Sequence, residues 1–237
     1  MNITKQEEIM YAVMKAVFDS GIPISFKGSM VLKACLMEKG FKEETRHTVD
    51  IDGNWHSSYA PAEEEMAESI QKALSNSNIN LNVSVCRNYG EGRSAGFEFT
   101  DPSSKEVLFS MDIDVNRPVI SSQIYEIEGI SFRGVSPVQM LADKVMSVST
   151  DKVFRRIKDV IDLYYMSFVF EFNKEEILAV LLKSRRVLND FEGFLYRVED
   201  LKHSYDKFRF SGNINKVPFD EVYQKVKDYI NDVIPNK

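Results

Sequence analysis

Two aspartates separated by a single residue, Asp50 and Asp52, are the strongest chemical signal in this chain. They lie in an extended segment, and side chains alternate between the faces of a strand, so both carboxylates point the same way. Two neighbouring carboxylates repel each other unless a cation lies between them. Magnesium is a hard cation that prefers oxygen ligands of this kind. The pair therefore predicts half of a magnesium site.

A glycine–serine turn, Gly28-Ser29, precedes the two aspartates and complements them. A short apolar strand over residues 22–26 leads into the turn, and a helix over residues 30–39 follows it. Glycine lets a backbone approach a phosphate closely, and a helix N-terminus favours anions. Either motif alone is usually only a turn or surface charge. Together they indicate phosphoryl or nucleotidyl transfer.

The same stretch resembles a known family. The run FKGSMVLKACL, followed by RHTVDID, is similar to the nucleotidyltransferase-fold toxins of the AbiEii/AbiGii abortive-infection group. In that family a Gly-Gly or Gly-Ser turn precedes a helix, and an Arg-x-Thr/Ser-x-Asp-Ile/Leu-Asp segment follows. Gly28-Ser29-Met30 stands where many members have Gly-Gly-Thr. The resemblance implies that Gly28, Ser29, Arg46 and Thr48 bind the nucleotide, beside Asp50 and Asp52.

A third carboxylate is expected on the strand predicted over residues 107–115. Its apolar side chains share one face, and Asp112 and Asp114 fall on the other. Strands rarely bury acids without a partner. Nucleotidyltransferase folds place a third carboxylate on a strand beside the first two. By its place in the Ile-Asp-Val segment Asp114 is the expected ligand. Asp112 is the alternative ligand. If neither acid binds a metal, the two simply face solvent at the edge of the strand.

The resemblance extends into the C-terminal half. LADKVMSVST contains Lys144, which matches the lysine-bearing helix of the family, and RRIKDVIDLYYM matches its Arg/Lys-x-x-Asp-x-x-Asp-Leu-Tyr segment. The resemblance implies that Lys144 binds the triphosphate and that Asp159 orients Lys144 or the attacking group. Three nearby basic residues could hold phosphate or nucleic acid: Arg155, Arg156 and Lys158. The structural alternative is that Asp162, Leu163 and Tyr164 only tie two domains together.

The rest of the chain must supply the elements that position these residues. Helical periodicity predicts helices over residues 4–20 and 61–75. Alternating apolar residues predict an antiparallel meander, joined to the strand of Asp50 and Asp52, over residues 81–87, 95–100 and 107–115. Beyond Gly134 the pattern is helical, with helices near residues 137–149, 153–170, 174–183, 187–203 and 218–233.

These elements predict an α+β protein with a nucleotidyltransferase-like mixed sheet and flanking helices. Residues 1–135 are expected to form the catalytic domain, and residues 136–237 a helical domain that closes the active-site cleft. Of the 237 residues, the first domain holds 13 Lys/Arg and 20 Asp/Glu (net −7) and the second holds 17 and 16 (net +1). This is not the overall charge of a general nucleic-acid binder.

The sequence also suggests the compartment and the partners of the protein. No apolar run is long enough to span a bilayer, the N-terminus has no signal-peptide pattern, and the two cysteines suit a reducing compartment. A cytoplasmic protein without a membrane partner is expected. The expected reaction uses a nucleoside triphosphate and two magnesium ions held by Asp50, Asp52 and Asp114.

By resemblance, the acceptor is an RNA such as tRNA, or a protein, and the chain is the toxin of a toxin–antitoxin pair. Two alternatives come from other classes. One is a catalytically silent interaction protein on the same fold, and the other is an enzyme that modifies a small molecule such as an antibiotic. The presence of all three carboxylates argues against the silent protein.

Overall fold

The computed structural model of this chain describes residues 3–43, 45–88, 94–210 and 216–235. The chain divides into two compact units, and each is described by itself. Unit 1 consists of Met1–Glu38 and Thr48–Ser136, and unit 2 consists of Lys39–His47 and Pro137–Lys237. Unit 2 thus includes a short segment that interrupts unit 1 in the sequence.

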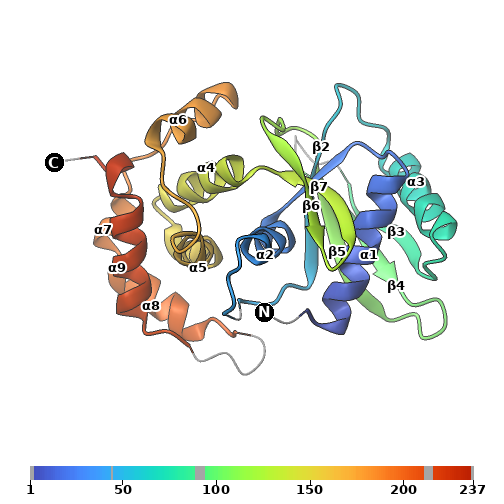
Figure 1. Ribbon diagram of the computed structural model, residues 1–237, viewed down its shortest axis with the longest axis horizontal. Coiled ribbons are helices and arrows are strands. Elements are labelled where there is room, and N and C mark those ends of the chain that lie inside the picture. Colours follow the sequence, from blue (N-terminus) through green and yellow to red (C-terminus); the bar gives the residue numbers. More distant parts are fainter. Residues whose placement is uncertain (1–2, 44, 89–93, 211–215, 236–237) are drawn as a thin grey trace. The chain divides into compact units, whose positions relative to one another are not determined.

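Unit 1 is a mixed sheet with helices, as labelled in Figure 1. Its helices are α1 (Lys5–Asp19), α2 (Gly28–Glu38) and α3 (Glu63–Asn76). Its strands are β1 (Ile24–Lys27), β2 (Asp50–Trp55), β3 (Asn82–Arg87), β4 (Ser94–Thr100), β5 (Val107–Asp114), β6 (Ser122–Ile127) and β7 (Ile130–Val135). Within the described residues these seven strands form one sheet in the order β3-β4-β5-β2-β1-β7-β6. The sheet with its helices confirms the α+β class.

The pairing of the strands confirms the predicted meander. β4 runs antiparallel to both β3 and β5, and β5 then pairs with β2, the strand that begins at Asp50. The β5–β2 pairing is parallel, whereas β1 pairs antiparallel with β2 and parallel with β7. β2 and β5 are therefore neighbours in the middle of the sheet, where both can contribute side chains to one site.

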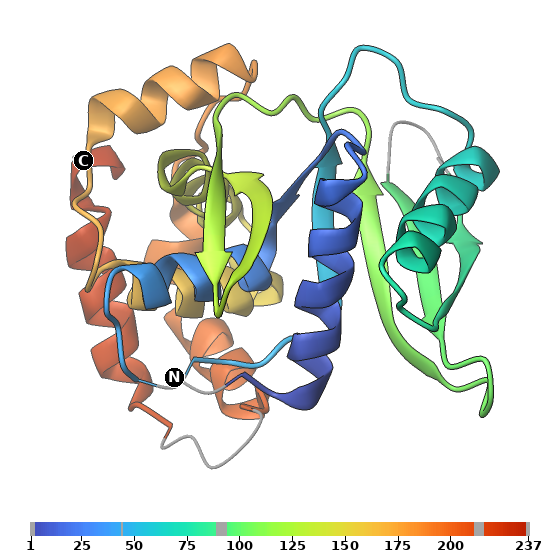
Figure 2. The same ribbon diagram turned by 45° about the vertical axis from the view of Figure 1, so that its right-hand side comes forward.

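One face of this sheet forms the core of unit 1. Ile51, Met111 and Ile113 are fully buried on it. On β7 the ring of Phe132 lies 5.8 Å from that of Tyr11 of α1 and 6.2 Å from that of Phe26 of β1. α1 also packs against α3. Figure 2 shows the two helices and the sheet in a turned view. Because the apolar side chains of β2 and β5 are used here, the alternate positions carry polar groups to the other face.

A hairpin that the sequence pattern does not predict completes the sheet. β6 and β7 pair antiparallel, and the turn between them places Glu128 and Gly129 at φ values of 50° and 79°. β6 is an edge strand and exposes half of its side chains, so its apolar alternation is weak. The pattern was therefore too faint to identify this hairpin.

Unit 2 is helical in its described residues. Its elements are α4 (Pro137–Val148), η1 (Val153–Arg156), α5 (Ile157–Met166), α6 (Lys174–Lys183), α7 (Glu192–Tyr196), α8 (Val198–Lys207), α9 (Phe219–Tyr229) and η2 (Asn231–Val233). The helix predicted over 174–183 is confirmed. The single helix predicted over 187–203 is wrong, because Phe191 has a φ of 61° and a left-handed residue cannot continue a right-handed helix.

The segment Lys39–His47 belongs to unit 2 because its side chains pack there. The ring of Phe41 lies 6.0 Å from the rings of both Tyr165 and Phe168. Arg46 pairs with Asp162 of α5. Among the described residues, none of the helices has the length and apolar character needed to cross a bilayer.

Candidate active site

The register of β2 and β5 places the acidic residues in rows on one face of unit 1. Asp52 is paired with Asp112, and Asn54 is paired with Asp114. Paired residues on neighbouring strands point to the same face, and so do residues two apart on one strand. Asp50 therefore joins this face as well. We call it the carboxylate face: Asp50, Asp52, Asp112, Asp114 and Asn54. The four acids are half-buried and Asn54 is buried.

Gly28 lies directly against this face. It joins β1 to α2 with a φ of +76°, a conformation that side-chain-bearing residues rarely adopt. A Cβ placed on Gly28 would lie 2.7 Å from Oδ2 of Asp52. Ser29 follows in the first turn of α2, whose N-terminus therefore begins beside the Asp52 carboxylate. An anion bound at that N-terminus would lie next to any cation that Asp52 holds.

Thr48 holds Asp50 in place. Its hydroxyl donates a hydrogen bond to Oδ1 of Asp50 at 2.5 Å, and the side chain is 6% exposed. The structure thus shows Thr48 beside a carboxylate of the site. Its expected contact with a nucleotide stays a prediction.

The two candidates for the third carboxylate have different partners. Oδ2 of Asp112 lies 3.2 Å from Arg87, which is 60% exposed. Oδ1 of Asp114 accepts hydrogen bonds from the backbone N–H groups of Asn116 and Arg117 at 3.0 and 3.1 Å. Its Oδ2 lies 3.8 Å from Nζ of Lys27 and 3.4 Å from Nε of Arg117. Asp112 is thus in register with Asp52, whereas Asp114 is held more rigidly.

The donors on the carboxylate face suit a magnesium ion. The described side chains contain no group of three or more His, Cys, Asp or Glu arranged as a metal site. Magnesium often takes only one or two carboxylates and completes its shell with water and substrate phosphates. Asp50 and Asp52 can supply those two carboxylates. The buried Oδ1 of Asn54 has no hydrogen-bond partner in the described chain, so the face also holds an unsatisfied oxygen acceptor.

Unit 2 contains a second charged cluster. Nζ of Lys144 donates hydrogen bonds to Asp159 at 2.8 Å and to Asp162 at 2.6 Å. Arg46 binds both carboxylate oxygens of Asp162, through Nε at 2.8 Å and through an Nη at 2.9 Å. Asp159 also pairs with Arg156 at 3.0 Å. We call Arg46, Lys144, Asp159 and Asp162 the lysine cluster.

Burial and charge act against each other in this cluster. Burial alone would raise the pKa of Asp162, but Arg46 and Lys144 together hold it well below its usual range. Burial alone would lower the pKa of Lys144, but Asp162 and Asp159 raise it above the ordinary value. Lys144 and Asp162 are therefore both charged at neutral pH. Charge-assisted hydrogen bonds to two carboxylates hold the ammonium group of Lys144 in a fixed position.

Asp162 is the member that the sequence did not identify as part of a site. Only 1% of its surface is exposed, and it joins the segment of Arg46 to the helix of Lys144. The signal available in the sequence was its position three residues after Asp159, which places both on one side of α5. Asp162 lies within unit 2 with both of its cations, so its observed contacts tie segments of that unit together.

The three basic residues near η1 have separate surroundings. Arg156 bonds to the Ser147 hydroxyl at 2.9 Å as well as to Asp159. The guanidinium of Arg155 lies 5.9 Å from the ring centre of Phe154, and Lys158 is exposed. Their expected role in holding phosphate or nucleic acid stays a prediction.

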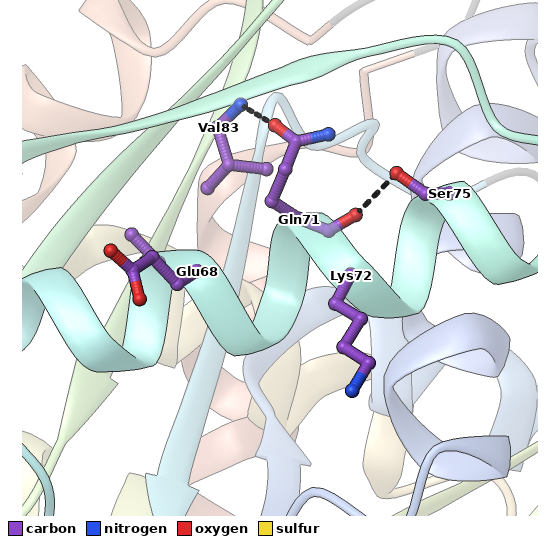
Figure 3. Close-up of a pocket in the computed structure, with 6 residues that line it drawn as sticks. Glu68, Gln71, Lys72, Ser75 and Val83 are labelled. Carbon is purple, nitrogen blue, oxygen red and sulfur yellow. Dashed lines mark hydrogen bonds between the residues drawn. The ribbon is translucent and has the colours of Figure 1, made fainter.

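A hollow of about 390 Å³ lies on unit 1 along α3 and β3, and none of the candidate residues lines it. It is lined by Ala67, Glu68, Gln71, Lys72, Ser75 and Val83. Figure 3 shows the side-chain oxygen of Gln71 accepting from the backbone N–H of Val83, a contact of 2.8 Å. Gln71 Nε2 also donates to the Leu81 carbonyl at 2.9 Å, so this side chain covers part of the edge strand. We attribute the hollow to the packing of Gln71 against β3.

Replacing Gly28 by alanine should impair both folding and the site. The substitution combines backbone strain of roughly 1–3 kcal/mol with a clash against the Asp52 carboxylate. Gly129→Ala is the matched control, since Gly129 has a φ of +79° and no described atom lies within 4 Å of its Cβ position. Thermal melting should fall in both variants. Nucleotide affinity should fall only in Gly28→Ala, and equal affinities in the two variants would remove the turn from the site.

Comparisons with known proteins bear on the family and the fold of this chain. A family model described as Nucleotidyl transferase AbiEii toxin, Type IV TA system, matches residues 11–225. The solved structure of MenT4, nucleotidyltransferase toxin Rv2826c from Mycobacterium tuberculosis H37Rv, matches with a TM-score of 0.60 at 14% identity, over 96% of this chain and 83% of that chain. An antigenic nucleotidyltransferase-like protein from Paracoccidioides brasiliensis matches with a TM-score of 0.48 at 13% identity, over 76% and 86% of the two chains. No curated protein matches the sequence.

At such low identity, the likeness to MenT4 shows a shared fold and confirms the nucleotidyltransferase-like class. The family match is independent of that likeness and covers the carboxylate face, the Gly28 turn and the lysine cluster. This chain therefore belongs to the AbiEii family of nucleotidyltransferase toxins of type IV toxin–antitoxin systems, and it is an enzyme of that class.

Proposed function

We propose that this enzyme moves a nucleotidyl group from a nucleoside triphosphate to an RNA acceptor such as a tRNA, and that it requires magnesium. The observation that carries the proposal is how closely the Asp52 carboxylate approaches Gly28, so closely that a Cβ on Gly28 would lie 2.7 Å from Oδ2. It brings a helix N-terminus suited to phosphate next to a carboxylate suited to a metal. Phosphate binding and metal binding are both needed for nucleotidyl transfer, and in this proposal both would use the same part of the chain.

In the proposed reaction the acceptor oxygen attacks the α-phosphorus, the bond from that phosphorus to the bridging oxygen breaks, and pyrophosphate leaves. Magnesium would neutralise the developing charge and activate the acceptor hydroxyl. Asp50, fixed by Thr48, and Asp52 would hold it, with Asp114 or Asp112 as the third carboxylate. Gly28 and Ser29 would keep the triphosphate against α2, and the proposed roles of Lys144 and Asp159 are to offset phosphate charge and to orient Lys144.

The proposed setting is the cytoplasm, where a cognate antitoxin would restrain the enzyme. RNA is the favoured acceptor because Arg155, Arg156 and Lys158 follow one another near η1 in a chain that is otherwise acidic. A polyanion needs such a local basic surface.

A labelling experiment tests the proposal. The protein is incubated with each of the four α-³²P-labelled ribonucleoside triphosphates, magnesium and total RNA, and the products are separated by size. Label should enter a discrete RNA band with one nucleotide preferred, and EDTA should abolish it. Label in the protein itself would redirect the proposal to a protein acceptor. Label only in a small molecule would favour antibiotic-type chemistry, and no label with any nucleotide would contradict transfer.

A further inference from the structure

Lys27 lies in the run FKGSMVLKACL, one residue before the Gly28-Ser29 turn. It is the last residue of β1 and directly precedes Gly28. In the register of β1 with β2 it lies opposite Asp52. Its side chain therefore leaves the sheet on the carboxylate face, beside the start of α2.

The side chain of Lys27 reaches across a whole strand. β2 lies between β1 and β5 in the sheet, yet Nζ of Lys27 is 3.8 Å from Oδ2 of Asp114 on β5. Neighbouring strands are about 4.8 Å apart, so the stem must pass over β2 to make this contact. The ammonium group thus lies above β2, on the side of the sheet from which Asp52 and Asn54 project.

Asp114 holds this ammonium group by charge. At 3.8 Å the pair is beyond hydrogen-bond distance, so it is an electrostatic contact. The Asp114 carboxylate is itself fixed, because its other oxygen accepts the two backbone N–H groups of Asn116 and Arg117. A fixed anion therefore helps to orient the ammonium group of Lys27.

Lys27 also differs from the other cations beside these acids. The side chains of Arg87 and Arg117 are 60% and 64% exposed, whereas that of Lys27 is 21% exposed. A charge that is less exposed to water is less screened and acts more strongly on a neighbouring anion. The buried, unsatisfied Oδ1 of Asn54 on this side of the sheet is a second sign that this part of the face is arranged around a ligand.

We propose that Lys27 binds the triphosphate of the nucleotide, and that Asp114 positions its ammonium group for that contact. This inference rests on the proposed function. The nucleotide adds several negative charges next to Gly28, one residue from Lys27. Lys27 then serves as a protein cation between the carboxylates and the phosphates, where it complements magnesium.

Calorimetric titration with non-hydrolysable nucleotides tests the inference. The probes are the α,β-methylene analogues of ATP, GTP, CTP and UTP in magnesium, and the variants are Lys27→Met and Lys27→Arg. Lys72→Met, an exposed lysine of α3, is the matched control. Lys27→Met should weaken binding about tenfold or more, as expected for the loss of a charge-assisted contact. Lys27→Arg should recover part of the affinity, and Lys72→Met should bind like the parent.

Manganese binding without nucleotide separates a phosphate contact from general damage to the face. Lys27→Met should bind Mn²⁺, followed by electron paramagnetic resonance, at least as tightly as the parent, because it removes a competing positive charge. Equal nucleotide affinity in the parent and Lys27→Met would overturn this inference but leave the proposed function standing. A parallel loss of nucleotide and Mn²⁺ binding would have the same consequence.

A parent that binds none of the four analogues overturns the proposed function and this inference with it. Should Lys27→Met lose its melting transition, Lys27→Arg and Lys27→Gln repeat the comparison. Equal affinity in those two variants then overturns the role of the charge.

Discussion

Asp52→Asn should reduce nucleotidyl transfer by roughly a thousandfold or more while the protein stays folded. Removing a single group that stabilises transition-state charge typically costs a hundred- to a thousandfold, and a metal ligand contributes at least as much. Asparagine keeps the size of the side chain next to Gly28 but removes the negative charge that a cation needs. Transfer is measured by incorporation of labelled nucleotide, and folding by circular dichroism and thermal melting.

The matched control is Asp19→Asn. Asp19 ends α1, its side chain is 49% exposed, and its surface pair with Lys15 should contribute little to stability. Its transfer rate should equal that of the parent. Near-parental transfer by Asp52→Asn would contradict the magnesium-dependent mechanism. Mn²⁺ binding by Asp112→Asn and Asp114→Asn then decides the third carboxylate, because the metal ligand should show the larger loss of metal affinity.

The sequence predicted the parts of the carboxylate face that depend on local spacing. Asp50 and Asp52 share a face because they lie two residues apart on a strand, and no tertiary information is needed for that. The position of β5 beside β2 also followed from the alternating pattern and the meander. The sequence could not decide between Asp112 and Asp114, because the register between two strands depends on how the whole sheet aligns.

The sequence missed features that depend on contacts between distant segments. Arg46 precedes Asp50 by only four residues, so its motif suggested a nucleotide contact, but its observed partner is Asp162, 116 positions away. Lys27 was overlooked for a related reason, since its contact with Asp114 exists only because β2 brings β1 and β5 to within one strand of each other. Conversely, the edge hairpin of β6 and β7 was missed because an exposed strand carries little apolar pattern.

Lys144→Met should destabilise the protein by roughly 3–5 kcal/mol, the usual cost of leaving a buried charge without its partner. From the sequence alone, the same substitution is expected to leave folding intact, because methionine keeps much of the apolar stem of an exposed lysine. In the structure Lys144 is 8% exposed and compensates Asp162, which is 1% exposed. Arg46 would remain on Asp162 and Arg156 on Asp159, but both carboxylates would lose the cation that they share. The free energy of unfolding is measured by urea denaturation followed by circular dichroism.

Lys202→Met, at an exposed position of α8, is the control and should unfold like the parent. Adding Asp159→Asn to Lys144→Met removes one of the two carboxylates that Lys144 compensates in the parent, so it should restore part of the lost stability. Transfer should stay about a hundredfold below the parent in this double variant, because the charge proposed to face the phosphate is still missing. Transfer that returns together with stability would show that Lys144 acts only as a structural ion-pair partner.

The pH dependence of the same variant gives an independent check. The pKa of Asp162 is lowered in the folded protein, so its stabilising effect is present above its unfolded pKa and is lost as the pH falls through the folded value. The pKa of Lys144 is raised, so its effect is present below its unfolded pKa and is lost as the pH rises through the folded value. Both groups are thus charged between about pH 4 and pH 10. The stability difference between the parent and Lys144→Met should be constant across that window, and a difference that grows or shrinks near neutral pH would mean that another titrating group controls the lysine cluster.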